Sequence, residues 1–476
     1  MKKTLKDIMY NAVYQLFLIV LPLLTTPILS RRIGAEGLGI YGYVFSIAQF
    51  LITAISIGMN PFRIRSIAKV RNNKKELSSQ FWNIYFMQLL IGIISIAIYL
   101  FCIFAFNIQY RNLYLIQLLF VLGVTLDISW FFQGIEEFAK VVTRNTLIKL
   151  SSIILIIIFV STKNDLWVYM LITSGINLIG SLVFWLGIVK RVSLPCFNKK
   201  VFKGLWKPGL MILIPQLFMQ VYTTLDKTIV GYFVNPIQLS YYDQSQKIAR
   251  IILAVLTSIT IVMLPKLSGA RARGEHDSII NYTKKSFDYT LVLSVILFNV
   301  VFANTITFVP WFFGSSFEPM IGNMMLVGVL ILVNPIGGVL SNQFSIAIEK
   351  DGAFALPLIL GAFVSVIGNI IIVPRFGSVG ATFVLIFVEI MVSFLRIFLV
   401  RKEISMKLLF NDKVCKFLLI ATLINIGTFY LIPATLPINP FLGMAIKSII
   451  IIIMYIPTLL FMFPEHRGVV KKMRGK

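Results

Sequence analysis

Apolar runs of about 20 residues recur along the whole chain, and this repetition restricts the fold more than any other feature. A helix needs about 20 apolar residues to cross the hydrocarbon core of a bilayer, whereas a strand of a membrane barrel needs only about 10. The chain of 476 residues is 58% hydrophobic and only 13% charged, with a mean hydropathy of +0.88. These values predict an all-α polytopic membrane protein and exclude a transmembrane barrel.

The apolar runs and the polar breaks between them predict fourteen transmembrane helices. Residues 8–29 lack a small-residue cleavage site after a short apolar core, so we interpret them as a retained first span and not as a signal peptide. The other predicted spans are residues 41–60, 82–106, 112–133, 147–161, 166–188, 208–234, 248–265, 289–309, 323–348, 354–373, 379–400, 414–432 and 441–463.

The basic residues orient these spans. With the N-terminus inside, about four fifths of the 44 lysines and arginines fall on inside segments, most densely in residues 63–75, 190–207 and 396–416. If one span were missed or counted in excess, every loop after that point would be assigned to the wrong side of the membrane. The bias therefore predicts a multi-pass membrane protein with an even number of spans and both termini in the cytoplasm. The formal net charge of +25 then reflects mainly topology, with contact to anionic lipid as the alternative, and not a nucleic-acid partner.

An internal repeat divides the chain. The tripeptide Gln-Leu-Phe at residues 15–17 returns at 216–218, and in each case a tyrosine follows 26 residues later, at Tyr41 and Tyr242. An even number of spans separates the two copies, so the halves are parallel repeats, and their interface is the expected path of a substrate. We predict two six-helix lobes, residues 1–190 and 191–402, followed by two additional helices and a basic tail, residues 403–476.

Residues 210–265 contain the most informative stretch, two apolar runs joined by a short polar crossing. The first run carries adjacent charges at Asp226 and Lys227, and each charge would cost about 2.5–3.5 kcal/mol at the bilayer centre, which makes both functional-site hypotheses. Pro215 predicts a bend in the same helix. At about 100° per residue, polar side chains share one helical face, and this polar stripe predicts a water-filled cavity or a polar neighbouring helix. The stripe consists of Gln216, Gln220, Thr223 and Lys227.

Two further carboxylates lie within predicted spans. Asp127 opens the segment DISWFFQGIEEF at the inner end of the fourth span, and we expect it to share a helical face with Trp130, Gly134 and Glu137. Glu389 lies near the middle of the twelfth span. Each of them, like Asp226, is a candidate for binding a coupling proton or sodium ion, or for closing a gate. The alternative is a structural carboxylate paired with a basic side chain of a neighbouring helix.

Several motifs together resemble one branch of a transporter superfamily. They are SRRIGAEGLGIYGYVFS at residues 30–46, DISWFFQGIEEF at 127–138 followed by Arg144-Asn145, LDKTIVGYF at 225–233, YYDQSQKI at 241–248 and LPKLS at 264–268. With the fourteen spans and the repeat, they resemble the polysaccharide transporter branch of the multidrug/oligosaccharidyl-lipid/polysaccharide exporter superfamily, the Wzx-type flippases. The resemblance covers nearly the whole chain. It implies that undecaprenyl-diphosphate-linked oligosaccharides are moved across the bacterial cytoplasmic membrane, for surface polysaccharide biosynthesis, by alternating access about a central cationic cavity.

Such a substrate requires cations in the transport path, because a diphosphate in a low-dielectric region needs Lys or Arg to replace its hydration. Lys227 is the first candidate because it continues the polar stripe. The other candidates are Lys247, Arg250, Arg31 and Arg32. A structural anchor is the alternative for Arg32, which lies at a helix end. The expected partners are the lipid-linked oligosaccharide, membrane lipids, and the polymerase and chain-length machinery of the polysaccharide pathway.

Two other functions stay open. One is an ion-coupled multidrug exporter of the same superfamily, for which twelve spans and a less basic cavity are usual. The other is a polytopic polysaccharide polymerase or ligase, which would have a large outer loop with catalytic residues. The outer loops here are short, so we do not expect an enzyme. No G-x-x-x-x-G-K-[ST] phosphate loop is present, which argues against ATP hydrolysis. The three cysteines and two histidines are scattered, so we expect no metal, disulfide or cofactor.

Overall fold

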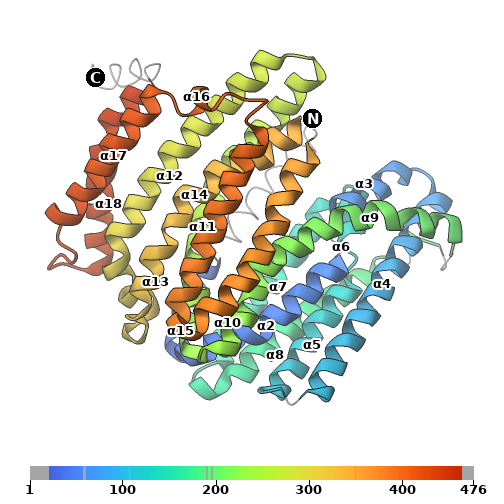
Figure 1. The fold of residues 1–476 in the computed structure, drawn as a ribbon. Coiled ribbons are helices and arrows are strands. Elements are labelled where there is room, and N and C mark those ends of the chain that lie inside the picture. The colour runs from blue at the N-terminus through green and yellow to red at the C-terminus, as the bar shows by residue number, and fades with distance from the viewer. Residues whose placement is uncertain are drawn as a thin grey trace. The chain divides into compact units, whose positions relative to one another are not determined.

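The computed structural model of the protein is built from helices (Figure 1). It describes residues 21–56, 60–106, 108–188, 191–193, 197–348 and 350–463, and no strand occurs in these ranges. The all-α prediction is therefore confirmed. By packing, the chain divides into two compact units, Met1–Ser240 and Tyr241–Lys476. The lobe boundaries at residues 190 and 402 refer to the sequence repeat and stay a prediction.

The membrane-spanning helices agree with the sequence. Eleven described helices are long and apolar enough to cross a membrane, and the bent pair Lys199–Met211 and Gln216–Phe233 is a further candidate. Every predicted span after the first falls largely on one of these helices. The predicted spans 354–373 and 379–400 are the two arms of one element, α15. Most of the first predicted span lies outside the described residues, as does the first copy of the Gln-Leu-Phe repeat, so the count of fourteen stays a prediction.

The first unit is arranged around α2 and α5. Helix α2 packs against α4, α5, α9 and α10, while α5 packs against α8 (Figure 1). The elements are α2 (Gly34–Ser56), α3 (Asn60–Val70), α4 (Lys74–Ala105), α5 (Arg111–Leu126), α6 (Ser129–Gly134), α7 (Phe138–Phe159), η1 (Lys163–Asp165), α8 (Leu166–Leu186), α9 (Lys199–Gln220), η2 (Val221–Leu225) and α10 (Asp226–Phe233). Residues 21–32 are also helical.

An aromatic core holds one end of this unit together. Phe81 of α4 lies at its centre, with ring centroids 5.0 Å from Phe131 and 5.6 Å from Trp130 of α6. The α6 helix also approaches α3 closely, since a Cβ added at Gly134 would lie 2.6 Å from the Ile67 side chain. The aromatic residues of the sequence segment WFF therefore hold the short α6 helix against α3 and α4.

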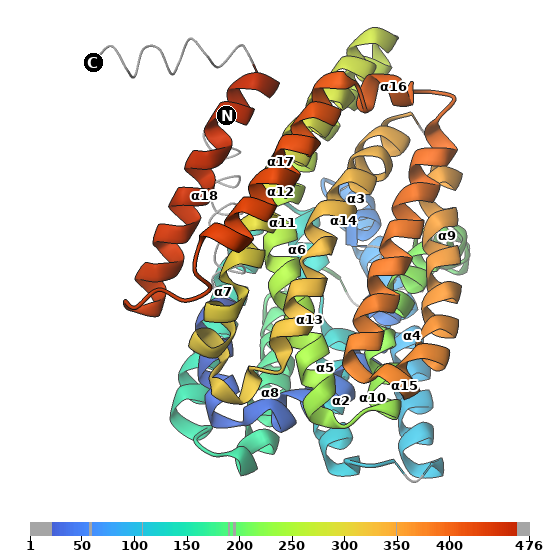
Figure 2. The ribbon, with the colours of Figure 1, turned by 60° about the vertical axis from the view of Figure 1, so that its left-hand side comes forward.

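The second unit is arranged around α12. Figure 2 shows α17 and α18 beside one another, and both pack against α12. The elements are α11 (Pro236–Ala272), which begins in the first unit, α12 (His276–Phe313), η3 (Ser315–Phe317), α13 (Met320–Val327), α14 (Val329–Gly338), η4 (Val339–Ser345), α15 (Asp351–Val400), α16 (Met406–Leu409), α17 (Asp412–Leu431) and α18 (Pro440–Met462).

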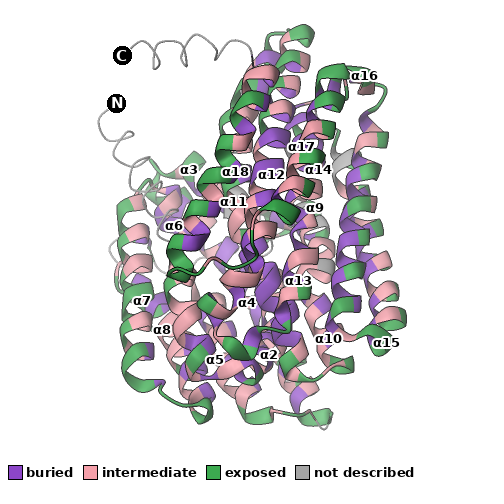
Figure 3. Ribbon diagram, turned by 90° about the vertical axis from the view of Figure 1, so that its left-hand side faces the viewer, coloured by how far each residue is buried: buried purple, intermediate pink, exposed green. Residues whose placement is uncertain are grey.

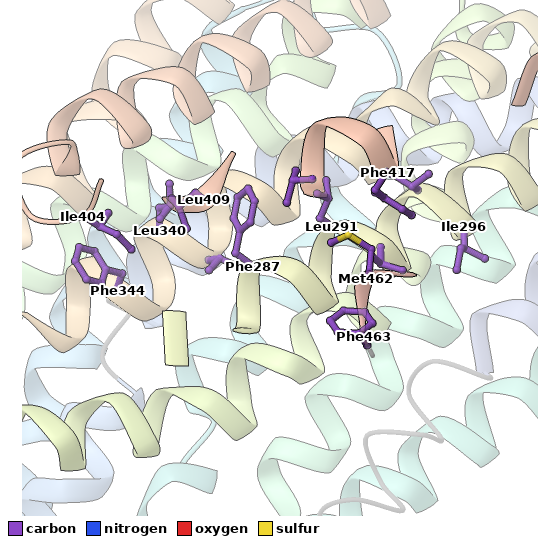
Figure 4. Close-up of a cluster of buried hydrophobic side chains, with 14 of the residues drawn as sticks. Phe287, Leu291, Ile296, Leu340, Phe344, Ile404, Leu409, Phe417, Met462 and Phe463 are labelled. Carbon is purple, nitrogen blue, oxygen red and sulfur yellow. The ribbon is translucent and has the colours of Figure 1, made fainter. Parts of the chain in front are cut away.

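The core of the second unit joins these helices near α16. Phe287 and Leu291 of α12 meet Phe344 of η4, Leu409 of α16 and Phe417 of α17 in one buried cluster (Figure 4). All five side chains are at most 2% exposed. The two additional C-terminal helices predicted from the sequence are thus packed into the core of this unit.

The α15 element is a helical hairpin. Its arms meet at Gly377, where φ is 58° and ψ is −143°, a conformation that only glycine adopts readily. The two arms approach each other closely because glycines lie at the contact between them. A Cβ added at Gly361 would lie 2.7 Å from Val392, and one at Gly368 would lie 2.9 Å from Val384. Small residues at a helix interface are typical of packing in membranes.

Several helices begin at an asparagine cap. In α4 the Asn73 side chain accepts hydrogen bonds from the backbone N–H groups of Lys75 and Glu76. Side chains of Asn198, Asn411 and Asn439 cap α9, α17 and α18 in the same way. Such caps satisfy backbone donors that have no partner within the helix. The polar breaks between apolar runs therefore contain the start signals of helices.

Large apolar side chains are exposed over the lengths of the helices. Phe101, Ile179, Phe394 and Ile453 are each more than half exposed. Figure 3 shows exposed and half-buried residues along the outward sides of the helices, with the buried residues between them. Exposed apolar surface on this scale indicates contact with lipid, because a water-soluble protein rarely exposes extended apolar patches.

Candidate functional site

Lys227 lies on a helix that bends and then passes through a π-helical turn. The segments Lys199–Met211 and Gln216–Phe233 are bent by 46° relative to one another. The bend falls in residues 212–215, so the bend predicted from Pro215 is confirmed. Farther along, η2 is a π-helical turn and α10 begins directly after it at Asp226. Helix breaks of this kind within a span are tolerated where the backbone is buried in protein or lines a cavity.

The π turn corrects the predicted polar stripe. Hydrogen bonds from i to i+5 place an extra residue in the turn, so Gln216 and Lys227 are not related by regular α-helical spacing. The hydroxyl of Thr223 donates to the carbonyl of Met219 at 2.8 Å, and the Gln220 side chain accepts a hydrogen bond from Thr224. The regular spacing of the stripe was wrong because it assumed one uninterrupted α-helix. A π turn inside a helix is itself frequent at functional sites.

Asp226 and Lys227 lie where this turn ends. Asp226 is 1% exposed, and its Oδ1 accepts the backbone N–H of Lys227 at 2.8 Å. Lys227 is half-buried. At the next residue, the hydroxyls of Thr228 and Ser46 lie 2.5 Å apart and join α10 to α2. A carboxylate and an ammonium group are thus held in the first unit beside a break in an apolar helix.

Two other predicted cations lie on α11 in the second unit. The ammonium group of Lys247 is 2.8 Å from the carboxylate of Asp243, which is 1% exposed. Arg250 is exposed and donates to the Gln246 side chain at 3.1 Å. Lys247 therefore neutralises a buried carboxylate on its own helix, one that the sequence interpretation did not single out. Arg250 presents its charge at the surface of α11.

Glu389 has different surroundings from the other carboxylates. It is 6% exposed on α15, and among the described residues no cation lies within ion-pair distance of it. Arg396 and Arg250 are the charges that act on it through space. Arg396 lies seven residues farther along α15, is 7% exposed, and has an Nε with no hydrogen-bond partner in the described structure. The second unit thus brings Arg250 and Glu389, both predicted from the sequence, into one electrostatic group with Arg396.

Asp127 does not share a continuous helical face with Trp130, Gly134 and Glu137. The α5 helix ends at Leu126, Asp127 is extended (φ −72°, ψ 125°), and the short α6 follows. The predicted common face was wrong because the segment contains two helix ends. The break allows the Gln88 side chain of α4 to donate to the carbonyls of Val124, Thr125 and Asp127.

The Asp127 carboxylate forms an ion pair with Arg144 of α7. The Arg144 Nη2 lies 3.2 Å from Oδ1, and the Ser129 hydroxyl donates to Oδ2 at 2.5 Å. Arg144 also donates to the carbonyl of Gly180 and lies 4.5 Å from the Phe184 ring centroid of α8. This one pair therefore connects α7 and α8 to the break between α5 and α6. It is the geometry expected of a structural carboxylate.

A buried arginine that the sequence interpretation missed lies close to the same break. Arg63 of α3 is 2% exposed, donates to Gln88 Oε1 at 2.7 Å and to the carbonyl of Ile55 at 2.9 Å, and lies over the Trp130 ring. Burial lowers the pKa of Arg63 to about 10, so its guanidinium remains charged at neutral pH. Its Nε makes no hydrogen bond among the described residues.

Arg32 caps the C-terminal end of α7. Its Nη1 donates to the carbonyls of Ile157 and Val160 at 2.6 and 2.7 Å, at the end of α7. A cation is favourable there because the carbonyls lack partners within the helix and the helix dipole is negative at this end. The geometry of Arg32 agrees with the structural alternative. Arg31, its neighbour, has an exposed side chain.

The second unit contains an apolar cavity of about 330 Å³ between α11, α12, α13 and α18. Its walls are mainly aliphatic and aromatic, and include Ile252, Phe308, Trp311 and Met444. Asn304 is the main polar group; its amide donates to Ser448, while its Oδ1 is buried with no partner among the described residues. A cavity with such walls suits a hydrocarbon chain.

The chain matches a known protein family. The sequence profile of the family described as "Polysaccharide biosynthesis protein" matches residues 4–271, more than half of the chain. The chain belongs to this family. It is 24% identical over 409 residues to a putative O-antigen transporter of Escherichia coli (strain K12), covering 84% of this chain and 97% of that protein. A putative O-antigen transporter of Shigella dysenteriae is 21% identical over 377 residues, covering 78% and 93%.

Solved structures place this family member in a known fold. The lipid II flippase MurJ, in an inward closed conformation, superposes with a TM-score of 0.72 at 15% identity, over 97% of this chain and 100% of MurJ. An inward-facing multidrug resistance MATE family transporter of the MOP superfamily superposes with a TM-score of 0.64 at 14% identity, over 85% and 99%. These likenesses show that the chain has the fold of this superfamily.

The structure adds residues that sequence reasoning did not select. Asp243, Arg63 and Arg396 are buried charges, and the first of them stands four residues before Lys247 within the motif YYDQSQKI. An i, i+4 search for opposite charges would have found that pair. Arg63 and Arg396 belong to stretches that we interpreted as basic loops, and the sequence has no signal that distinguishes a buried arginine from a loop arginine there.

Proposed function

We propose that the protein is a flippase that moves undecaprenyl-diphosphate-linked oligosaccharides across the membrane by alternating access. The observation that carries this proposal is the family match combined with the likeness to a putative O-antigen transporter, which covers 84% of this chain and 97% of that protein. The fold supports it, because MurJ, named a lipid II flippase, has the same architecture. Flipping of a lipid-linked saccharide needs no bond to be broken, so the protein's task is to provide a path for a charged and hydrophilic head.

The cations of both units suit the diphosphate. Lys227 lies at the π turn of the first unit, and Arg250 is exposed on α11 in the second. Each can replace part of the hydration that a diphosphate loses within the membrane. Lys247 and Arg32 are engaged with Asp243 and with carbonyls of α7, so we assign them supporting roles. Arg31 completes the proposed cationic path.

The apolar cavity of the second unit suits the other end of the substrate. A polyprenyl chain is long and apolar, and the cavity between α11, α12 and α18 is lined almost entirely by apolar side chains. Burial of apolar surface would favour binding at about 25 cal/mol per Å². In this proposal the lipid chain binds at the second unit while the head group passes along the cations.

The proposed orientation follows the basic residues. Both termini lie in the cytoplasm, the membrane is the bacterial cytoplasmic membrane, and the product is delivered to a polysaccharide polymerase with its chain-length machinery. The sequence lobes 1–190 and 191–402 are the proposed moving parts. Glu389 is the proposed coupling residue, because it is buried without an ion-pair partner among the described residues, whereas Asp127 is paired with Arg144.

A reconstituted flipping assay tests the proposal. Purified protein in liposomes is given a fluorescent undecaprenyl-diphosphate-linked disaccharide, and the fraction that becomes inaccessible to a quencher on one side is followed with time. We expect Lys227→Arg to keep most of the activity and Lys227→Gln to lose at least tenfold per folded molecule, because the charge is what neutralises the diphosphate. Lys200→Gln is the matched control, since Lys200 is exposed in the first turn of α9, outside the proposed path.

Two outcomes would overturn these assignments. Wild-type protein that does not flip the diphosphate-linked lipid, but exports a cationic dye, would favour the multidrug exporter. Wild-type rates in Lys227→Gln would remove Lys227 from the path while leaving the flippase function in place.

A further inference from the structure

A second cavity lies wholly within the first unit, at the end where α2, the turn between α4 and α5, and the start of α11 meet. Its volume is about 480 Å³, which is within the range of about 300–1,000 Å³ typical of small-molecule sites. Its polar lining residues are three tyrosines and two residues with side-chain amides. They are Tyr43, Tyr110, Tyr232, Gln109 and Asn235.

The backbone around this cavity holds its side chains in place. Tyr110 has a φ of 64°, which is uncommon for a bulky residue and occurs mainly where the surrounding structure fixes it. The Tyr43 ring lies directly on α10, since a Cβ added at Gly231 would be 2.5 Å from it. Behind them, a Cβ at Gly39 would be 1.7 Å from the carbonyl oxygen of Pro236, so α2 touches the start of α11. The cavity is therefore built by close backbone contacts.

Several polar side chains of the cavity have hydrogen-bonding groups that the described residues do not use. Among the described residues, the hydroxyls of Tyr43, Tyr110 and Tyr232 make no hydrogen bond. Asn235 uses its Oδ1 to accept the backbone N–H of Gln238 at 2.9 Å, which leaves its amide nitrogen as a donor. Tyr232 is 77% exposed and its ring packs edge-on against that of Phe233, so we infer that one ring face is open. No ionisable carboxylate or amine is among the lining residues, which favours a neutral ligand.

We propose that this cavity binds one or two neutral pyranose rings of the transported oligosaccharide. A pyranose has an apolar C–H face that suits an open aromatic ring, and hydroxyls that suit phenol and amide groups. The proposal rests on the flippase function and deepens it. With the predicted orientation, this end of the unit faces outward. The cavity is then a sugar subsite on the exit side, separate from the cations that contact the diphosphate.

Saturation-transfer NMR tests this with the full-length protein in lipid nanodiscs. The probes are the methyl glycosides of glucose, galactose, mannose, rhamnose and N-acetylglucosamine, and oligosaccharides released by mild acid from the surface polysaccharide of the source strain. We expect at least one probe to give transfer from the wild type. Tyr232→Ala should reduce the signal at least fivefold because the open ring is lost, whereas Tyr232→Phe should keep most of it.

Two more variants sharpen the test. Asn235→Asp keeps the oxygen that caps α11 but removes the amide donor, so it should weaken binding severalfold without unfolding the helix. Tyr430→Ala is the matched control, because Tyr430 is also 77% exposed but lies on α17 in the second unit. The saturation-transfer signal of this variant should equal that of the wild type.

Absence of saturation transfer from the wild type to every probe would refute the sugar subsite. A transfer signal that persists in the double variant Tyr232→Ala/Asn235→Asp would refute it as well. The flipping assay separates the two proposals. Wild-type protein that flips the lipid but binds no sugar here refutes the subsite alone. Protein that binds sugar at this cavity but does not flip refutes the transport function alone.

Discussion

The ion pair between Asp127 and Arg144 provides the sharpest test of how the first unit is held together. The two side chains are 26% and 16% exposed, so the pair is neither a surface pair nor fully buried. Exposed pairs contribute about 0–1 kcal/mol, and removing one partner of a buried pair costs about 3–5 kcal/mol. For this intermediate burial we expect the two groups to be coupled by about 1–2 kcal/mol.

The two single substitutions should not be equivalent. Asp127→Asn keeps an oxygen that can accept from Arg144, whose guanidinium still has the Gly180 carbonyl and the Phe184 ring. We expect it to cost about 1–2 kcal/mol of unfolding free energy. Arg144→Gln loses all of these contacts and leaves a carboxylate whose hydrogen-bonding side chain among the described residues is Ser129, so it should cost about 2–4 kcal/mol.

A double-mutant cycle measures the coupling. Each protein is unfolded reversibly with SDS in mixed micelles, followed by tryptophan fluorescence, and the double variant Asp127→Asn/Arg144→Gln closes the cycle. The exposed pair Arg273 and Glu275 is the matched control and should show no measurable coupling. A coupling for Asp127 and Arg144 within about 0.5 kcal/mol of zero would refute the structural role. Normal stability of Asp127→Asn together with lost transport would return Asp127 to the coupling candidates.

The remaining predictions concern Glu389 and a close helix contact. Glu389→Gln should leave the protein folded, because no ion pair to Glu389 is present among the described residues. The same variant should abolish the dependence of flipping on a proton or sodium gradient imposed across the liposomes. Gradient dependence equal to that of the wild type would exclude Glu389 as the coupling group. Gly39→Ala should destabilise the protein by about 1–3 kcal/mol, because the new methyl group would meet the Pro236 carbonyl. The control in thermal unfolding is Gly175→Ala, whose methyl group would meet no atom within 4 Å and should not lower stability. Equal melting temperatures for the two variants would contradict the close contact of α2 with the start of α11.

The sequence alone determined the class of fold, because hydropathy is a local property of each segment. Runs of about 20 apolar residues have one stable solution in lipid, the helix, so the positions of the spans follow from the order of apolar and polar residues. The bend near Pro215 was also predictable, since proline acts on its own helix. Asparagines at the polar breaks marked helix starts for the same local reason.

Only the tertiary structure decided which charges of different helices are paired. Asp127 and Arg144 are separated by 17 residues, and their meeting depends on the helix break at Asp127, which a regular 100° periodicity does not reveal. The π turn after Gln220 likewise altered the predicted polar stripe, because a change from i+4 to i+5 hydrogen bonds leaves no mark in composition. Arg63 resembled a loop cation in the sequence, yet it is buried against Gln88 and Trp130. Pairing and burial of a charge depend on side chains from distant helices, and the sequence of one helix does not specify them.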